Sequence, residues 1–329
     1  MSELLDGVRD PGLATLATVL DPVGLATSLR PVLPRPWGAL REVRVHVTKH
    51  YPGKRCTVAI ALHTTSGWHD LIGKVYATDR SDVYRALDGL RQAGFGPDAA
   101  YSIPQPLVFV PALRLLLLEK APGTVAKELV VAGHEGERVL AADRCARWLA
   151  RFQAVAPCSG PLFDLRAQTA ARWARGLAPL EGPLADKARR LRAHVDAAAG
   201  ALNDGSVCAG HGSYSPSHVI LAAGRTVTID WDGYDVADPA RDVARFIIAL
   251  KRLALSRLGS IRALDAVADV FVQTYVGLGR PDVAARLPCY EAAFCLQIAS
   301  NMAHRGRPHW QMKVETMLDE GLRLVEEQQ

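Results

Sequence analysis

The sequence lacks the cysteine spacings of metal and redox motifs. Zinc, haem and thioredoxin-like sites depend on closely spaced cysteines such as CxxC, and this chain contains no CxxC pair. Its six cysteines are Cys56, Cys145, Cys158, Cys208, Cys289 and Cys295. We therefore expect reduced thiols, most of them packed in the core.

Long apolar runs are also missing. A helix needs about 20 predominantly apolar residues to cross a bilayer, and no uninterrupted run approaches that length. The N-terminus, MSELLDGVRDPG, carries acidic residues where a signal peptide would be basic. The sequence therefore predicts a cytoplasmic protein without a membrane partner.

Runs of like charge are absent as well. The net charge of +5 comes from 39 Lys and Arg against 34 Asp and Glu, and no segment holds five or more like charges. Nucleic-acid-binding arms usually contain such runs, so we expect no nucleic-acid partner. Apolar residues make up 49% of the chain and charged residues 22%, which excludes a disordered protein and a coiled coil.

The length of 329 residues is more than one hydrophobic core usually organises, so we expect two lobes. From about Leu40 to Leu118 the sequence favours strands. REVRVHVTKHYPGKRCTVAIALHTTSGWHDLIGKVYA holds three alternating runs separated by YPGK and TTSG, which predict an antiparallel meander. SDVYRALDGLRQAGFG predicts a helix, and LVFVPALRLLLLEK predicts two further strands that are broken at Pro111.

After Gly123 the sequence becomes helical, and only the stretch from His211 to Trp231, with SHVIL and VTIDW, predicts a short hairpin. The expected fold class is α+β, with a small antiparallel β-sheet lobe that contains one helix and a larger, mainly helical lobe. We expect an N-terminal helical extension over residues 1–38, the β-sheet lobe over 39–122, and the helical lobe over 123–329 with its hairpin region at 207–235.

Three stretches carry candidate residues that we expect to converge on a phosphate between the lobes. In HVTKHYPGKRCTV, backbone N–H groups of a turn together with Lys54 and Arg55 could contact phosphate oxygens. In LIGKVYA, Lys74 lies among apolar residues, where an ammonium needs a counter-charge or a place at the rim. Taken alone, these features are more typical of an ordinary turn and of a surface lysine than of a phosphate site.

The third stretch is HGSYSPSHVIL, followed by TIDWDGYDVADPARDVA. A predicted strand ends on Asp230, where a carboxylate could hold magnesium or simply begin a turn. Hairpin geometry brings Ser213 and His218 close to it. Asp238 and Pro239 are favoured first residues of a helix, and Asp242 follows one turn later.

Together, GKVY, LLLLEKAPG, HGSYSPSHVIL and IDWDGYDVADPARDVA resemble the aminoglycoside phosphotransferase family, which belongs with choline kinases to the protein-kinase-like fold. The resemblance covers most of the chain from about residue 40. It implies ATP or another nucleoside triphosphate and Mg²⁺ as cofactors. Lys74 would contact the α- and β-phosphates, Asp230 would be the principal magnesium ligand, and Asp242 would brace the loop at His211. The segment that meets the adenine would be Glu119, Lys120 and Ala121.

The departures from the family pattern fall on the chemistry. Ser213 takes the position of the catalytic aspartate, and an ordinary hydroxyl cannot accept a proton as a carboxylate does. His218 stands where the family has Asn or Gln as second magnesium ligand, and imidazole suits magnesium poorly. The helix after Lys74 has no Glu to pair with it, and Asp82 and Asp88 are its only acids. The resemblance therefore implies a degenerate catalytic loop.

Two function classes stay open, and with them the question whether the chain is an enzyme. The first is a pseudokinase-like protein that binds nucleotide and acts as a binding or partner subunit. The second is an active ATP-dependent O-phosphotransferase that acts on a small hydroxylated molecule or on a peptide Ser or Thr. Phosphoryl transfer relies chiefly on positioning and charge neutralisation, so slow transfer without the carboxylate is consistent with the sequence.

The acceptor and any protein partner are indicated only broadly. Proteins of this kind resemble components of bacterial peptide natural-product pathways, in which a lyase is the partner of the kinase. We expect the acceptor pocket to be lined by residues 166–202 and the C-terminal helices, with cationic and aromatic character from Arg166, Arg172 and Trp173. That character favours an anionic or peptide ligand over a polycationic drug.

Overall fold

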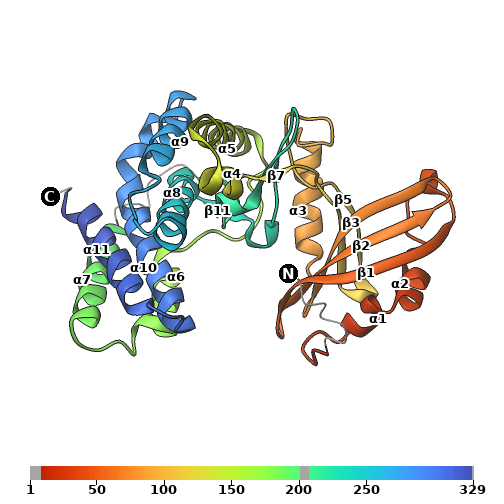
Figure 1. Cartoon of the computed structure of the whole chain (residues 1–329), viewed down its shortest axis with the longest axis horizontal. Helices are drawn as coiled ribbons and strands as arrows, with labels where there is room; N and C mark the ends of the chain where they lie inside the picture. The colour runs from red at the N-terminus through yellow and green to blue at the C-terminus, as the bar shows by residue number, and fades with distance from the viewer. Residues whose placement is uncertain (1–8, 201–206, 328–329) are drawn as a thin grey trace. The chain divides into compact units, whose positions relative to one another are not determined.

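The structure is a computed structural model that describes residues 9–200 and 207–327. The chain divides into two compact units, unit 1 (Met1–Pro122) and unit 2 (Gly123–Gln329), whose elements are labelled in Figure 1. The division falls within the Pro-Gly element at residues 122 and 123. The mixture of an antiparallel sheet and many helices confirms the predicted α+β class.

Unit 1 is built on a five-stranded antiparallel sheet in the order β1-β2-β3-β6-β5. The meander and the two later strands are therefore as predicted. The strands of this sheet are β1 (Leu40–Tyr51), β2 (Arg55–Thr64), β3 (Gly67–Tyr76), β5 (Pro106–Val110) and β6 (Leu115–Glu119), and unit 1 also contains the short strand β4 (Tyr101–Ser102). The helices are α1 (Leu16–Leu20), α2 (Pro22–Leu29) and α3 (Ser81–Gln92), with short 3₁₀ segments at η1 (Arg35–Trp37) and η2 (Pro111–Leu113).

Strand β2 shows how the two faces of this sheet differ. Its burial alternates strictly, with every second residue from Cys56 to Thr64 buried and the residues between them half-buried. Because successive side chains of a strand point to opposite faces, one face is a packed core and the other is more open. Register places Thr57 opposite Lys74, so both lie on the more open face.

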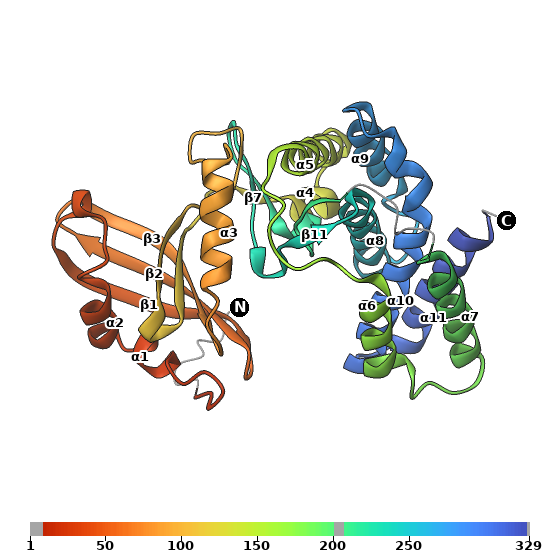
Figure 2. The same cartoon turned by 180° about the vertical axis from the view of Figure 1, so that it is seen from behind.

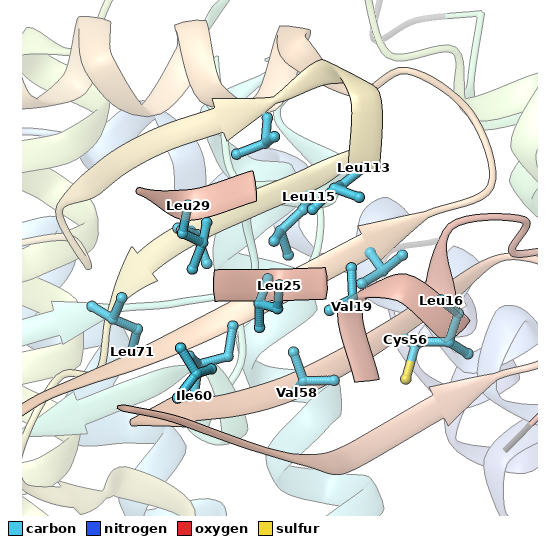
Figure 3. Close-up of a cluster of buried hydrophobic side chains, with 14 of the residues drawn as sticks. Leu16, Val19, Leu25, Leu29, Cys56, Val58, Ile60, Leu71, Leu113 and Leu115 are labelled. Atoms are coloured by element: carbon cyan, nitrogen blue, oxygen red, sulfur yellow. The ribbon is translucent and has the colours of Figure 1, made fainter. Parts of the chain in front are cut away.

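Helices α1 and α2 cover the packed face. Leu16, Val19, Leu25 and Leu29 are buried against strand residues that include Val58 and Ile60 (Figure 3). Each large apolar side chain buried in this way contributes about 2 kcal/mol. Both helices fall within the segment predicted as an N-terminal extension, and they form part of the core of unit 1.

Local sequence explains where α2 begins. The Asp21 side chain accepts hydrogen bonds from the N–H groups of Val23 and Gly24, at 3.2 and 2.9 Å. Pro22 occupies the first helical position, where its fixed φ and missing N–H cost nothing. A strong N-cap and a proline therefore start the helix at the point where the chain must turn back across the sheet.

Unit 2 is mainly helical, as expected. Its helices are α4 (Ala126–Ala132), α5 (Glu135–Val155), α6 (Leu165–Arg172), α7 (Gly182–Ala198), α8 (Pro239–Arg257), α9 (Asp265–Gly277), α10 (Leu287–Arg305) and α11 (Trp310–Glu326). A π-helical segment, η3 (Trp173–Leu177), follows α6, and 3₁₀ segments lie at η4 (Pro216–His218), η5 (Trp231–Gly233) and η6 (Pro281–Arg286). Helix α10 packs against α6, α7, α8 and α11 (Figure 2).

Short strands interrupt the helices of unit 2 and carry the loop of interest. They are β7 (Thr124–Val125), β8 (Cys208–Gly210), β9 (Val219–Leu221), β10 (Thr226–Thr228) and β11 (Asp235–Ala237). Strands β9 and β10 pair antiparallel, which confirms the predicted hairpin, and β8 pairs antiparallel with β11. The segment from His211 to Tyr234 is thus fixed at both ends by the β8–β11 pair.

Two of the absences in the sequence have structural counterparts. All six cysteines are free thiols, and four of them are buried. Within residues 9–200 and 207–327, no helix combines the length and the apolar character needed to cross a bilayer.

Candidate functional site

The candidate residues of unit 1 begin with Lys74 on β3. Its side chain is buried, with 7% exposed, on the sheet face opposite α1 and α2. The two acids of α3 that the sequence offered as counter-charges are engaged elsewhere. Asp82 pairs with Arg80 at 2.9 Å and Asp88 pairs with Arg91 at 2.7 Å. Neither acid of α3 therefore supplies the missing Glu.

The turn between β1 and β2 is held from the N-terminal side. Asp10 Oδ2 accepts a hydrogen bond from the Gly53 N–H at 2.8 Å and lies 2.8 Å from His50 Nε2. The Gly53 N–H, and next the His50 side chain, lower the pKa of Asp10. Gly53 has a φ of 67°, which glycine adopts without strain. The backbone N–H expected to contact phosphate is thus already bonded to a carboxylate.

The cations of this turn have different surroundings. Lys54 is exposed, and Arg55 is half-buried with its guanidinium 5.3 Å from the Tyr51 ring centroid. Lys49 lies over the same ring at 4.8 Å. Cation–π contacts of this length restrict both side chains near the tip of the turn.

The predicted adenine-contacting segment closes unit 1. Glu119 Oε2 accepts a hydrogen bond from the Gln105 N–H at 3.1 Å, and the Glu119 N–H donates to the Gln105 carbonyl at 2.9 Å. Lys120 forms an exposed ion pair with Asp70 at 3.0 Å, and Ala121 is half-buried. The Glu119 side chain is therefore used to fix the backbone of its own segment.

In unit 2 the loop after β8 is anchored through His211, which is fully buried. Its N–H donates to Asp242 Oδ2 at 2.7 Å, and its Nε2 lies 3.0 Å from the Ile229 carbonyl oxygen. A carbonyl only accepts, so we assign the ring proton to Nε2. Nδ1 is then the acceptor for both the N–H and the hydroxyl of Ser213, each at 3.3 Å.

The protonation of His211 follows from its burial. Burial, and next the neighbouring His218, lower the pKa of the His211 imidazole to about 4. The ring is therefore neutral at pH 7. The Ser213 hydroxyl faces a neutral imidazole and, within the described residues of unit 2, hydrogen-bonds to no carboxylate.

Asp242 belongs to a buried ionic cluster that supports the loop. Its carboxylate is 3.0 Å from Arg241 Nη1, and both side chains are 1% exposed. Arg241 also pairs with Asp235. Burial raises the pKa of Asp235 to about 6, although Arg241 opposes that shift. The Asp235 carboxylate is committed to the frame of the loop.

Gly212, which follows His211, has no room for a side chain. Gly212 has a φ of 77°, and a Cβ at this position would lie 2.0 Å from the Gly233 carbonyl oxygen. The loop also reaches helix α5, because the buried Tyr214 hydroxyl donates to the Cys145 carbonyl at 2.7 Å. The sequence HGSY therefore specifies a rigid loop.

His218 and Asp230 face each other across the loop. His218 Nδ1 lies 2.8 Å from the Ser213 carbonyl oxygen, to which it donates, and Nε2 lies 3.5 Å from Asp230 Oδ2. Asp230 has a left-handed φ of 67°, a conformation that non-glycine residues adopt mainly where the surrounding structure imposes it. The loop therefore brings together Ser213, His211, His218, Asp230 and Asp242.

The donor set limits which metal fits. Mg²⁺ takes oxygen ligands and is usually held by one or two carboxylates together with substrate phosphates. Asp230 supplies one such carboxylate, whereas the His218 imidazole is a poor ligand for Mg²⁺. No cluster of three His, Cys, Asp or Glu suited to a metal occurs in the described parts of the chain. Asp230 therefore fits as a protein ligand of one Mg²⁺ whose further ligands would include phosphate oxygens of a nucleotide.

The order of these residues agrees with a family-level comparison. The sequence matches the family model "Phosphotransferase enzyme family" over residues 62–284, which is more than half of the chain. The chain belongs to this family. Comparison with curated proteins finds no match.

Solved structures place the phosphotransferase-family chain in the expected fold. The aminoglycoside phosphotransferase APH(4)-Ia is 15% identical, with 92% of this chain and 98% of that chain covered and a TM-score of 0.61. The choline kinase LicA from Streptococcus pneumoniae is 13% identical, with coverages of 92% and 98% and a TM-score of 0.59. A choline/ethanolamine kinase family protein from Mesorhizobium loti is 16% identical, with coverages of 81% and 85% and a TM-score of 0.57. The predicted protein-kinase-like fold is confirmed.

A pocket of about 590 Å³ opens beside the loop that carries Ser213 and His218, entirely within unit 2. Ser213, Ser215, Ser217 and His218 form its loop side, and α8, α10, α11 and the loop between α10 and α11 supply the rest. Arg166, Arg172 and Trp173, which we expected to line the acceptor pocket, do not line this pocket.

The C-terminal helices α10 and α11, which we also expected at the acceptor pocket, do contribute to this lining. Trp173 instead stacks with Arg192 at 4.9 Å. The sequence reasoning missed Arg245 and Arg252 of α8. The sequence feature that could have identified these two arginines is their spacing of seven residues, which places both on one face of a helix.

Proposed function

We propose that this phosphotransferase-family protein binds a nucleoside triphosphate with Mg²⁺ but is degenerate in catalysis, and that it acts as a binding or partner subunit. One observation carries the proposal. At the position that the resemblance assigns to the catalytic aspartate, the chain has Ser213, whose side chain is a hydroxyl and not a carboxylate.

Nucleotide binding is supported by the residues that remain. Lys74 provides a buried ammonium on the open face of the sheet, and Asp230 provides a carboxylate in a constrained backbone conformation. A thermostable mutant of APH(4)-Ia with a TM-score of 0.60 is a ternary complex with AMP-PNP and hygromycin B. When bound, the metal ion would neutralise phosphate charge, and Asp230 would hold it.

The size of the expected defect can be bounded. General-base help is worth about 10²- to 10⁴-fold in rate. His211 cannot restore it directly, because its buried Nδ1 contacts Ser213 and not the pocket. The His218 imidazole in place of an oxygen ligand weakens a second metal position as well. As a binding subunit that transfers no phosphoryl group, the chain would hold its ligand for a partner protein, such as a lyase.

A second candidate function is an active ATP-dependent O-phosphotransferase, and the Ser213–His211 hydrogen bond favours it. The acceptor hydroxyl could pass its proton to Ser213 Oγ while Ser213 passes its own proton to Nδ1 of His211. A pKa of about 4 gives this imidazole nearly the basicity of an aspartate carboxylate, whose ordinary pKa is about 3.9. The pocket beside Ser213 would then hold the acceptor, a small hydroxylated molecule or a peptide Ser or Thr.

Calorimetry tests nucleotide binding. We expect the native protein to bind ATP in the presence of Mg²⁺, and Asp230→Asn to weaken that binding at least tenfold. Asp186→Asn, an exposed change on α7 with the same loss of charge, is the matched control. Absence of ATP binding by the native protein would refute both candidate functions.

Substitution at Ser213 separates the two candidates. If the loop is degenerate, the native protein hydrolyses ATP only at background rate, and Ser213→Ala leaves that rate unchanged. If Ser213 relays a proton, Ser213→Ala lowers the rate at least tenfold. Ser213→Asp tests whether the rest of the site is intact. A gain of more than about tenfold in the rate of ATP hydrolysis would show that only the general base is missing.

A further inference from the structure

The pocket beside Ser213 is lined by six cationic side chains and by no carboxylate. The six are Arg245, Arg252, Arg257, Arg305, Arg307 and Lys313. They come from α8, from the end of α10 and the loop after it, and from α11, which are neighbouring elements of unit 2 (Figure 2). A lining of one sign sets this pocket apart from an ordinary surface depression.

None of the six forms an ion pair within residues 9–200 and 207–327. Elsewhere in unit 2, cations at comparable positions are paired, as Arg262 is with Glu320 at 2.8 Å and Arg286 with Asp238 at 2.8 Å. The side chain of Arg245 makes a 3.3 Å hydrogen bond to Gln297, while its buried Nε has no partner. The protein therefore supplies positive charge here without supplying the counter-charge.

The two arginines of α8 define one wall. Arg245, Ala249, Arg252 and Ser256 follow one another at spacings of four, three and four residues, which is one face of a helix. Burial lowers the pKa of Arg245 to about 10, and Arg252 is the next contributor. Burial also lowers the pKa of Arg252, with Arg305 and Arg257 adding to that shift. Like charges are crowded together here, and among the leading influences on the pKa of Arg245 only Asp242 opposes the downward shift.

The remaining lining limits the size and the character of the ligand. Ile298, Met302, Pro308 and Trp310 contribute apolar surface, and Trp310 offers an aromatic face to a sugar ring or a comparable scaffold. A volume of about 590 Å³ lies within the range of about 300 to 1,000 Å³ that is usual for sites binding one small molecule. An extended peptide would need a longer groove.

We infer that this pocket binds a small hydroxylated molecule that carries at least two negative charges, such as a phosphorylated sugar, with its anionic group on Arg245 and Arg252 and a hydroxyl toward Ser213. The inference rests on the proposed function for the neighbouring nucleotide site. Arginine suits the ligand's anionic group because its planar donors bind phosphate or carboxylate oxygens in pairs. The same lining repels cationic drugs.

Calorimetry with a ligand series provides the test. The probes are glucose 6-phosphate, glucuronate, glucose and a cationic aminoglycoside, each added to the full chain. We expect glucose 6-phosphate to bind at least tenfold more tightly than glucose, and the aminoglycoside not to bind. Weaker binding of glucuronate, which carries one negative charge, would support the requirement for two charges, whereas binding equal to that of glucose 6-phosphate would contradict it.

Variants connect the binding to the pocket. Arg252→Gln and the double change Arg245→Gln with Arg252→Gln should weaken glucose 6-phosphate binding by about tenfold and more than a hundredfold, because charged hydrogen bonds are lost. Arg151→Gln, a change at an exposed arginine of α5 outside the pocket lining, should leave it unchanged. Equal affinity for glucose, or affinity unaffected by the α8 changes in a folded protein, would overturn the inference.

Measurements with ATP separate this inference from the proposed function. If Asp230→Asn weakens ATP binding and leaves glucose 6-phosphate binding intact, both stand. If ATP fails to bind the native protein while glucose 6-phosphate still binds through Arg252, the proposed function fails and the anion site remains. If ATP competes with glucose 6-phosphate and both depend on Arg252, the pocket is a nucleotide site and the inference is wrong. Binding of an acidic peptide in preference to all four probes would also overturn it.

Discussion

The carboxylate of Asp10 accepts a hydrogen bond of 2.8 Å from the backbone N–H of Gly53, 43 residues further along the chain. The same carboxylate oxygen contacts His50, and the other accepts a hydrogen bond from the Gly12 N–H at 2.9 Å. The turn between β1 and β2 is thus tied to the segment that leads into α1. We propose that this turn contacts the phosphates of a nucleotide, and its rigidity should then affect nucleotide affinity.

We predict that Asp10→Ala loosens this turn and Asp10→Asn does so less, because an amide oxygen can still accept from Gly53. Amide hydrogen exchange at Gly53 should become faster in the order native, Asn, Ala. Because the Gly53 N–H lowers the pKa of Asp10, its stabilising effect is present at neutral pH and is lost as the pH falls below about 4. Unchanged exchange in the Ala variant would show that the bond does not hold the turn.

Asp242 should be the most costly acid of the loop to remove. Asp242→Ala leaves Arg241 without one of its two carboxylates and the His211 N–H without its acceptor, all in a buried setting. Breaking a buried pair on one side costs about 3 to 5 kcal/mol. Urea unfolding should show this loss for Ala and a smaller one for Asn.

The comparison for Asp242 is an exposed ion pair. Asp186, which pairs with Arg189 at the surface of α7, should change the free energy of unfolding by less than about 1 kcal/mol when replaced by Ala. Equal costs at the two positions would mean that the cluster around Asp242 adds nothing beyond a surface pair.

From the buried carboxyl group of Glu291 we predict how the free energy of unfolding depends on pH. Burial raises the pKa of Glu291 on α10 to about 7, and the balance among Lys251, Glu320, Arg323 and Asp265 around it does not cancel that shift. The folded state therefore holds a proton that the unfolded state has released. This contribution to stability falls as the pH rises from about 4.5 to about 7 and stays low above that.

Glu291→Gln should remove this dependence. Relative to the native protein, the variant should gain up to about 3 kcal/mol more free energy of unfolding at pH 8 than at pH 5. Urea unfolding at the two pH values measures the difference, with the exposed Glu128→Gln as a control that should show none. A gain that is the same at both pH values would contradict the raised pKa.

Two glycines with the same backbone conformation should respond differently to alanine. Gly53 and Gly212 have φ values of 67° and 77°, which cost alanine about 1 to 2 kcal/mol. At Gly53 no atom lies within 4 Å of the added Cβ, whereas at Gly212 the Gly233 carbonyl oxygen lies 2.0 Å away. Gly212→Ala should lower the melting temperature clearly more than Gly53→Ala. Equal decreases in melting temperature for the two variants would mean that the loop around Gly212 can shift to make room for the added Cβ.

Much of the fold could be predicted because it depends on local periodicity. The alternation in β2 and the helical spacing after Gly123 are properties of neighbouring residues, and each produced the expected element. The family assignment followed from motifs that are compact in sequence. The role of α1 and α2 could not be predicted in this way, because covering a sheet face depends on contacts between residues far apart, such as Leu25 and Ile60.

The site was predicted where its residues are contiguous in sequence and missed where they are not. His211, Ser213, His218, Asp230 and Asp242 lie within one stretch, and a hairpin with a following helix brings them together. The acceptor pocket was assigned to the helical insert at residues 166–202 and to the C-terminal helices, and its cationic character was inferred from the arginines of that insert. Composition cannot tell which helix faces the loop, and the helix that does is α8.

The placement of α1 and α2 over the sheet also bears on where this protein can be cut. The family match begins at residue 62, inside β2, and a boundary drawn there divides a strand. A shortened protein beginning at Leu40 would keep every strand of the sheet, yet it would present Val58, Ile60 and their apolar neighbours to water. A contiguous apolar surface of this kind promotes self-association. Preparations meant to isolate the sheet unit should therefore retain the chain from at least Asp10 onward.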